Sequence, residues 1–111
     1  IIDDQGRVDG YQHLFHLMRT SIDFYLFNDP LQPKLMLLAN DYHKLVGDNV
    51  DSVYYFSQVS GDQEYLIKGK RFDSVYFSIS IYGGEPNGEI VEGVTNNINH
   101  TQIEFEKDGS F

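Results

Sequence analysis

The segment from Gly47 to Gly84 constrains the fold more than any other part of this chain. After a polar loop at residues 48–51, apolar residues alternate with polar ones in three runs, Val53–Val59, Glu64–Lys70 and Ser74–Tyr82. Such alternation, rich in tyrosine, phenylalanine, valine and isoleucine, is typical of pleated, partly buried strands. The connectors at residues 60–63 and 71–73 have hairpin length, which predicts antiparallel pairing of neighbouring strands. We therefore expect an antiparallel β-meander.

The region before Gly47 has the period of a helix. From Asp9 onward, apolar residues recur at steps of three and four: Tyr11, Leu14, Phe15, Met18, Ile22, Tyr25 and Leu26. This spacing predicts an amphipathic helix of about four turns, which starts after an Asp9 N-cap and packs its apolar stripe inward. The opposite side is polar and is expected to face solvent: Gln12, His13, His16, Arg19, Thr20 and Asp23. A second, shorter helix is expected from Pro33 to about His43.

The length of 111 residues allows one domain with a modest core. We expect a single α+β domain over residues 1–111, with a helical part at 9–46 and an antiparallel β part at 47–111. Thr101–Glu106 reads as a further strand, whereas residues 94–100 are too polar to assign. The turn signal at residues 107–109 would return the chain through Ser110 and Phe111, where the sequence stops.

That ending predicts an incomplete hairpin. One reading is that the chain is the first part of a larger, β-sandwich-like domain, so that the rest of the same protein covers the open sheet edge. The other reading is that a neighbouring protomer supplies the missing strand, because native proteins cover or blunt exposed edges.

The charge of the chain disfavours several classes of partner. It has 8 Lys and Arg against 17 Asp and Glu, a formal charge of −9, whereas phosphate backbones and anionic membrane surfaces require clustered basic side chains. Nucleic-acid and membrane partners are therefore not expected. Without cysteine there can be no disulfide, thiolate metal site or cysteine nucleophile. No apolar run reaches the roughly 18 residues of a membrane span and no signal segment is evident, so a soluble chain is expected and its compartment is left open.

Several short motifs follow one another in a characteristic order. They are Asp9-Gly10-Tyr11-Gln12-His13-Leu14, Gly47-Asp48-Asn49 with Asp51, Tyr54-Tyr55, Glu64-Tyr65 with Lys68-Gly69, Val75-Tyr76-Phe77-Ser78 and Asp108-Gly109-Ser110-Phe111. In their order and spacing the chain resembles the N-terminal part of the bacterial family called domain of unknown function 1214 (DUF1214). Val50 departs from the family pattern, in which proline usually stands at this place. The resemblance implies a β-rich, sandwich-like fold with a helical N-terminal part, in proteins several times longer than this chain, and it implies no established activity.

The polar loop before the first predicted strand is one candidate site. Asp48, Asn49 and Asp51 cluster side-chain oxygens that could bind a polar ligand or a cation such as Ca²⁺. The alternative is a turn in which these side chains bond their own backbone. The spacing does not fit an EF-hand loop, because Val50 stands at its third position. We predict no metal and no cofactor.

The strand predicted at residues 74–82 carries a second candidate site. Its alternate positions form a face of hydroxyls and rings: Ser74, Tyr76, Ser78, Ser80 and Tyr82. Tyr54 and Tyr65 are expected beside it. Tyrosine offers a stacking surface and a hydrogen-bonding tip, which suits a sugar or another small polar molecule; the alternative is an ordinary half-buried sheet. The predicted ligand-binding residues are Asp48, Asn49, Asp51, Tyr54 and Tyr76.

No catalytic set can be recognised in the sequence. No serine lies in a GxSxG elbow, and His13 and His16 share a helix face without an evident third metal ligand. Asn99-His100-Thr101 is an N-glycosylation acceptor triplet. The sequence favours a β-rich module that binds a small molecule or carbohydrate. Two alternatives remain open: a hydrolase-type enzyme whose catalytic residues lie beyond residue 111, and a structural subunit that assembles through edge-strand complementation.

Overall fold

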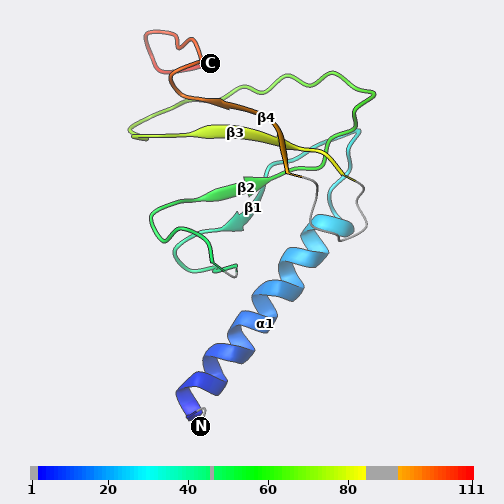
Figure 1. Cartoon of the computed structure of the whole chain (residues 1–111), viewed down its shortest axis with the longest axis vertical. Helices are drawn as coiled ribbons and strands as arrows, with labels where there is room; N and C mark the ends of the chain where they lie inside the picture. Colours follow the sequence, from blue (N-terminus) through cyan, green and yellow to red (C-terminus); the bar gives the residue numbers. More distant parts are fainter. Residues whose placement is uncertain (1–2, 46, 85–92) are drawn as a thin grey trace. The chain divides into compact units, whose positions relative to one another are not determined.

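A computed structural model describes residues 3–45, 47–84 and 93–111 (Figure 1). Within these residues the elements are one helix, α1 (Asp4–Tyr25), and four strands, β1 (Met36–Ala39), β2 (Tyr54–Phe56), β3 (Ser78–Tyr82) and β4 (Val94–Asn99). β1 pairs with β2 and β3 with β4, both antiparallel. The fold is therefore of the α+β class, as expected. Contacts divide the chain into an N-terminal unit, residues 1–64, and a C-terminal unit, residues 65–111, and each is described by itself.

Helix α1 begins earlier than predicted. Its N-cap is Asp3, whose carboxylate accepts a hydrogen bond from the Gly6 amide at 2.8 Å. The predicted cap, Asp9, lies inside the helix, and its carboxylate accepts from Gln5 Nε2 at 2.8 Å. Both aspartates suit an N-cap. Asp3 is the N-cap because a helix that starts there forms more backbone hydrogen bonds and places Asp4 at the positive end of the helix dipole.

The side of α1 that packs within the N-terminal unit is the polar one. Phe24 stacks on Phe56 of β2 with ring centroids 3.9 Å apart, and the ring of His16 lies 4.8 Å from that of His43. The apolar stripe, from Tyr11 to Leu26, is exposed. The prediction of a buried stripe and a solvated polar side was therefore wrong. Periodicity finds the apolar side of a helix, but long-range contacts decide which side is covered.

Strand β1 lies where a second helix was expected, between Pro33 and His43, so the prediction of that helix was wrong. Leucine and methionine favour helices, but the neighbouring strand overrides this preference through backbone pairing and side-chain packing. Met36 lies opposite Phe56 and Leu37 opposite Tyr55; after a bulge, Ala39 lies opposite Tyr54. Among the described residues, the buried ones are Ala39, at the end of β1, and Asn28.

In the C-terminal unit the strand pairing differs from a meander. The partner of β3 is β4, whereas in residues 64–70 the pairing described is a single bridge between Lys70 and Ser110. The strand predicted at Thr101–Glu106 was also wrong, because a turn follows β4, with the Gln102 amide donating to the Asn99 carbonyl at 2.9 Å. The strand lies instead at Val94–Asn99, where two polar pairs, Ser78–Asn99 and Ser80–Asn97, flank the apolar pair Ile79–Ile98.

The turn predicted at residues 107–109 is present. The Gly109 amide donates to the Glu106 carbonyl at 2.9 Å, and Gly109 has a positive φ of 81°. The chain then pairs with an earlier segment: Phe111 and Gly69 exchange two backbone hydrogen bonds, at 3.0 and 3.1 Å. The ring of Phe111 stacks on Phe77 at 5.2 Å and meets Phe105 edge-on at 5.8 Å. These three rings form the aromatic cluster of the C-terminal unit.

Candidate functional site

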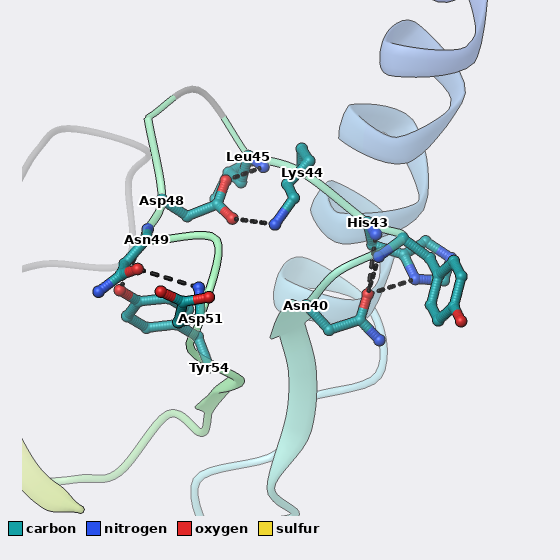
Figure 2. Close-up of polar contacts among 9 residues, drawn as sticks. Asn40, His43, Lys44, Leu45, Asp48, Asn49, Asp51 and Tyr54 are labelled. Atoms are coloured by element: carbon teal, nitrogen blue, oxygen red, sulfur yellow. Dashed lines mark hydrogen bonds and ion pairs between the residues drawn. The ribbon is translucent and has the colours of Figure 1, made fainter. Parts of the chain in front are cut away.

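The polar loop before β2 bonds largely to itself (Figure 2). One carboxylate oxygen of Asp48 accepts from the Leu45 amide at 2.7 Å, and Lys44 Nζ donates to the other at 3.4 Å. Only 9% of the Asp48 side chain is exposed. The bond from the Leu45 amide, with a contribution from Lys44, holds the pKa of Asp48 below its usual value. This carboxylate is thus an ionised anchor of the loop, and both of its oxygens are engaged.

Asn49 organises the following turn. Its Oδ1 accepts from the Asp51 amide at 3.0 Å, and its own amide donates to the Tyr54 hydroxyl at 3.4 Å. Figure 2 shows the side chains of Asp51 and Tyr54 beside it. The structure therefore brings four of the predicted site residues together, in the geometry of an Asx turn. Asp51 is exposed, and its carboxylate is the acidic group of this loop that faces solvent.

A second polar cluster links α1 to the turn after β1, and the sequence analysis missed it. Asn40 Oδ1 accepts from the amides of Tyr42, at 2.9 Å, and His43, at 2.8 Å, and lies 3.2 Å from His43 Nδ1. Because this oxygen can only accept, Nδ1 carries the ring proton. His43 Nε2 then accepts from Arg19 Nη1 at 3.1 Å.

Three effects lower the pKa of His43. The largest is partial burial of the ring, followed by the positive charge of Arg19 and then by His16. All three favour neutral imidazole, which is the form that can accept the hydrogen bond from Arg19. This cluster therefore acts as a structural clasp between α1 and the turn after β1. Within the described part of the chain, no group of three or more histidine, aspartate or glutamate residues could hold a metal ion.

The hydroxyl face of β3 gains a row of polar side chains from β4. The register places Ser78 opposite Asn99 and Ser80 opposite Asn97. Asn97 Nδ2 donates to Ser80 Oγ at 2.6 Å, and Thr95 Oγ1 donates to the Ile81 carbonyl at 3.0 Å. We call this surface the hydroxyl–amide face; it consists of Ser78, Ser80, Tyr82, Asn97 and Asn99. All but the half-buried Asn99 are exposed.

Tyr76 lies just beyond the last pair of the β3–β4 ladder. Its ring meets the ring of His100 edge-on at 5.2 Å, and the His100 amide donates to the Phe77 carbonyl at 2.9 Å. Tyr76 and Ser74 are outside β3, so the predicted strand was too long at its start. Tyr54 belongs to the N-terminal unit, and its expected place beside β3 stays a prediction.

The glycosylation triplet forms a turn of its own at the end of β4. Asn99 Oδ1 accepts from the Thr101 amide at 2.9 Å and from the Thr101 hydroxyl at 2.7 Å. The Asn99 amide donates to Gln102 Oε1 at 3.0 Å. These contacts position the Asn99 side chain at one end of the hydroxyl–amide face. Its glycosylation stays a prediction.

Comparison with family models, with curated proteins and with solved structures found no match to this chain. The resemblance to the DUF1214 family therefore stays a prediction, as does the larger sandwich. No helix in residues 3–45, 47–84 and 93–111 combines the length and apolar character needed to cross a bilayer. Among the candidate sites, the hydroxyl–amide face presents exposed polar groups, whereas in the loop at residues 48–51 the side-chain oxygens of Asp48 and Asn49 already accept hydrogen bonds from the chain itself.

Proposed function

We propose that this protein binds a small polar molecule, in the first place a neutral carbohydrate, on the hydroxyl–amide face of β3 and β4. The observation that carries the proposal is the 2.6 Å hydrogen bond from Asn97 Nδ2 to Ser80 Oγ. It fixes a hydroxyl and an amide side by side on an exposed strand pair. Groups that are ordered before binding lose less conformational entropy when a ligand arrives.

The chemistry of this face suits sugar hydroxyls. The amide oxygen of Asn97 can accept and the hydroxyl of Ser78 can both donate and accept, so the two match the dual character of a sugar hydroxyl. Tyr82 and Tyr76 are each more than half exposed and offer rings against which a pyranose could stack. The charge of −9 favours neutral over anionic sugars.

The loop at residues 48–51 supports the same function less well. Asp48 already uses both carboxylate oxygens, and Asn49 uses its side-chain oxygen on the Asp51 amide. A ligand there would have to replace those bonds, and each intramolecular bond contributes about 0.5–1.5 kcal/mol, more when one partner is charged. Of the five predicted ligand-binding residues, Tyr76 is the one that belongs to the C-terminal unit, just before β3.

A glycan array tests the proposal. The whole chain is applied to immobilised neutral glycans and compared with Asn97→Ala. We expect the variant to bind about tenfold more weakly, since it loses one direct hydrogen bond and frees the Ser80 hydroxyl. The matched control is Asn96→Ala, on the same strand but opposite Ile81 and therefore on the other face of the sheet.

Binding that is equal in the two variants, or no binding of any neutral glycan, would contradict the proposal. Circular dichroism of both variants confirms that the fold is retained. Bound glycans are then incubated with the protein and analysed for cleavage. Cleavage would show that residues 1–111 catalyse hydrolysis themselves, whereas recovery of intact glycans supports binding without hydrolysis by these residues.

A further inference from the structure

The apolar side of α1 follows a stricter rule than amphipathicity requires. Six apolar residues succeed one another at steps of three, four, three, four and three: Val8, Tyr11, Phe15, Met18, Ile22 and Tyr25. Alternating steps of three and four define the heptad repeat, whose apolar positions form the seam of a coiled coil. We call these six residues the heptad stripe. Their exposed fractions run from 42% at Ile22 to 66% at Tyr11 and Phe15.

The other side of α1 is already engaged within the N-terminal unit. Phe24 stacks on Phe56, and His16 and Arg19 contact His43. None of the three helix residues in these contacts belongs to the heptad stripe. The helix is thus held by one side and presents to solvent a regular apolar seam, which by the ridges and grooves of helix packing suits another helix.

We propose that the heptad stripe pairs with the same stripe of a second copy of this chain, in an antiparallel two-helix coiled coil. When the two helices are centred between residues 16 and 17, Val8 faces Tyr25, Tyr11 faces Ile22 and Phe15 faces Met18. Every layer then joins one aromatic side chain to one aliphatic side chain. Such alternation of large and small partners fills a seam without voids or overpacking.

A parallel arrangement of the two copies fits less well. In register, it would stack Phe15 on Phe15 and Tyr25 on Tyr25, and leave Val8 against Val8. Asp4 stands one step before Val8 in the same repeat, so a parallel pair would also face two aspartates at one end. The antiparallel pair separates the acidic helix starts and aligns the two helix dipoles favourably.

The area available is sufficient for a modest dimer. A fully exposed aromatic side chain offers ~150–250 Å². At the exposed fractions given above, the six residues present on the order of 500 Å² per helix, or about 1,000 Å² over a pair, the lower bound for a specific interface. The 22-residue helix is about 33 Å long, enough for all six layers.

The first test is sedimentation of the whole chain over a range of concentrations. We expect a monomer–dimer equilibrium, and at least a tenfold weaker dimer for Phe15→Glu, which buries a charge at the centre of the seam. The matched control is Gly10→Glu, which adds the same charge off the stripe, where a side chain meets open space. Because Phe15 is largely exposed in one copy, helix content by circular dichroism should be unchanged.

The second test fixes the orientation and exploits the absence of cysteine in this chain. Val8→Cys and Tyr25→Cys chains are mixed and oxidised. The antiparallel seam predicts the mixed disulfide, because residue 8 of one copy faces residue 25 of the other and lies roughly 25 Å from the second residue 8. Excess Val8→Cys homodimer would overturn the antiparallel arrangement. A protein that stays monomeric at all concentrations would overturn the proposal. A dimer whose affinity is unchanged by Phe15→Glu would also overturn it and would point to strand addition at a sheet edge.

Discussion

At Gly69 the backbone passes directly against the ring of Phe111. A Cβ added there would lie 2.7 Å from Phe111 Cζ and 2.8 Å from Cε1. The ring has little freedom to move aside, because it stacks on Phe77 and meets Phe105 edge-on. The two backbone hydrogen bonds between Gly69 and Phe111 hold the two segments at this separation. Glycine is thus required here by a close approach of side chain to backbone.

We therefore expect Gly69→Ala to lower the free energy of unfolding of the C-terminal unit by about 1–3 kcal/mol, the range for an overpacked site. Urea denaturation followed by tyrosine fluorescence measures it. The control is Gly61→Ala, where nothing lies within 4 Å of the added Cβ and a change within about 0.5 kcal/mol is expected. Equal effects of the two substitutions would show that Phe111 does not pack on Gly69.

His43 makes the stability of the N-terminal unit depend on pH. Its pKa in the folded chain is lowered from 6.5, chiefly by partial burial and then by Arg19 and His16. The unfolded chain therefore takes up a proton at a higher pH than the folded chain does. Above 6.5 both forms are neutral and this residue gives no pH dependence. As pH falls through 6.5 toward the folded pKa, the unfolded chain is favoured and stability decreases.

We expect the urea concentration at the midpoint of unfolding to decrease as the pH is lowered from about 7 to about 5, the range where histidine titrates. In His43→Gln this part of the decrease should be absent, since the substituted side chain does not titrate. His13→Gln, on α1 but outside the contacts of His43 with Asn40, Arg19 and His16, should keep the wild-type decrease. Identical pH profiles for wild type and His43→Gln would rule out the clasp between His43, Asn40 and Arg19.

At the scale of elements, periodicity predicted α1 but neither its start nor its packing. The steps between Tyr11 and Tyr25 identify a helix whatever covers it. The side that packs depends on Phe24 meeting Phe56 and on His43 meeting Arg19, contacts between residues more than twenty positions apart. The heptad spacing of the stripe can be seen in the sequence alone. It is stricter than the spacing required of a helix that packs one side against a core.

The aromatic strands β2 and β3 could be predicted from the sequence, whereas the aliphatic β1 and the polar β4 could not. Tyr54–Phe56 and Ser78–Tyr82 lie inside predicted runs, whereas β1 was read as helix and β4 was not assigned. β4 contains three asparagines, residues that strands usually avoid. Its stability comes from a partner that offers hydroxyls, as in the bond from Asn97 to Ser80. A single sequence does not reveal which partner a polar strand will find.

The candidate site could be predicted only in part, because the partner of a strand cannot be read from a single sequence. Asp48, Asn49, Asp51 and Tyr54 are close in the sequence, and they do lie together, in the loop before β2 and at the first residue of that strand. The serines of β3 were found from alternation. Their amide partners on β4 required the register between two strands, which the sequence did not supply.

At the scale of the whole molecule, the two units contribute different surfaces. The N-terminal unit carries the heptad stripe, and the C-terminal unit carries the hydroxyl–amide face. A dimer formed through α1 would hold two copies of that face, and two linked weak sites bind a multivalent glycan more tightly than one when both can engage. The net charge of −9 should disfavour binding of such an assembly to anionic surfaces.

The most direct test of binding at the hydroxyl–amide face is a nuclear magnetic resonance titration of the whole chain with neutral saccharides. We expect amide shift changes confined to residues 76–82 and 95–99, with the Asn97 and Ser80 amides among the largest. Shift changes at residues 48–54 would assign binding to the acidic loop instead. No shift change with any neutral saccharide would contradict carbohydrate binding by this protein.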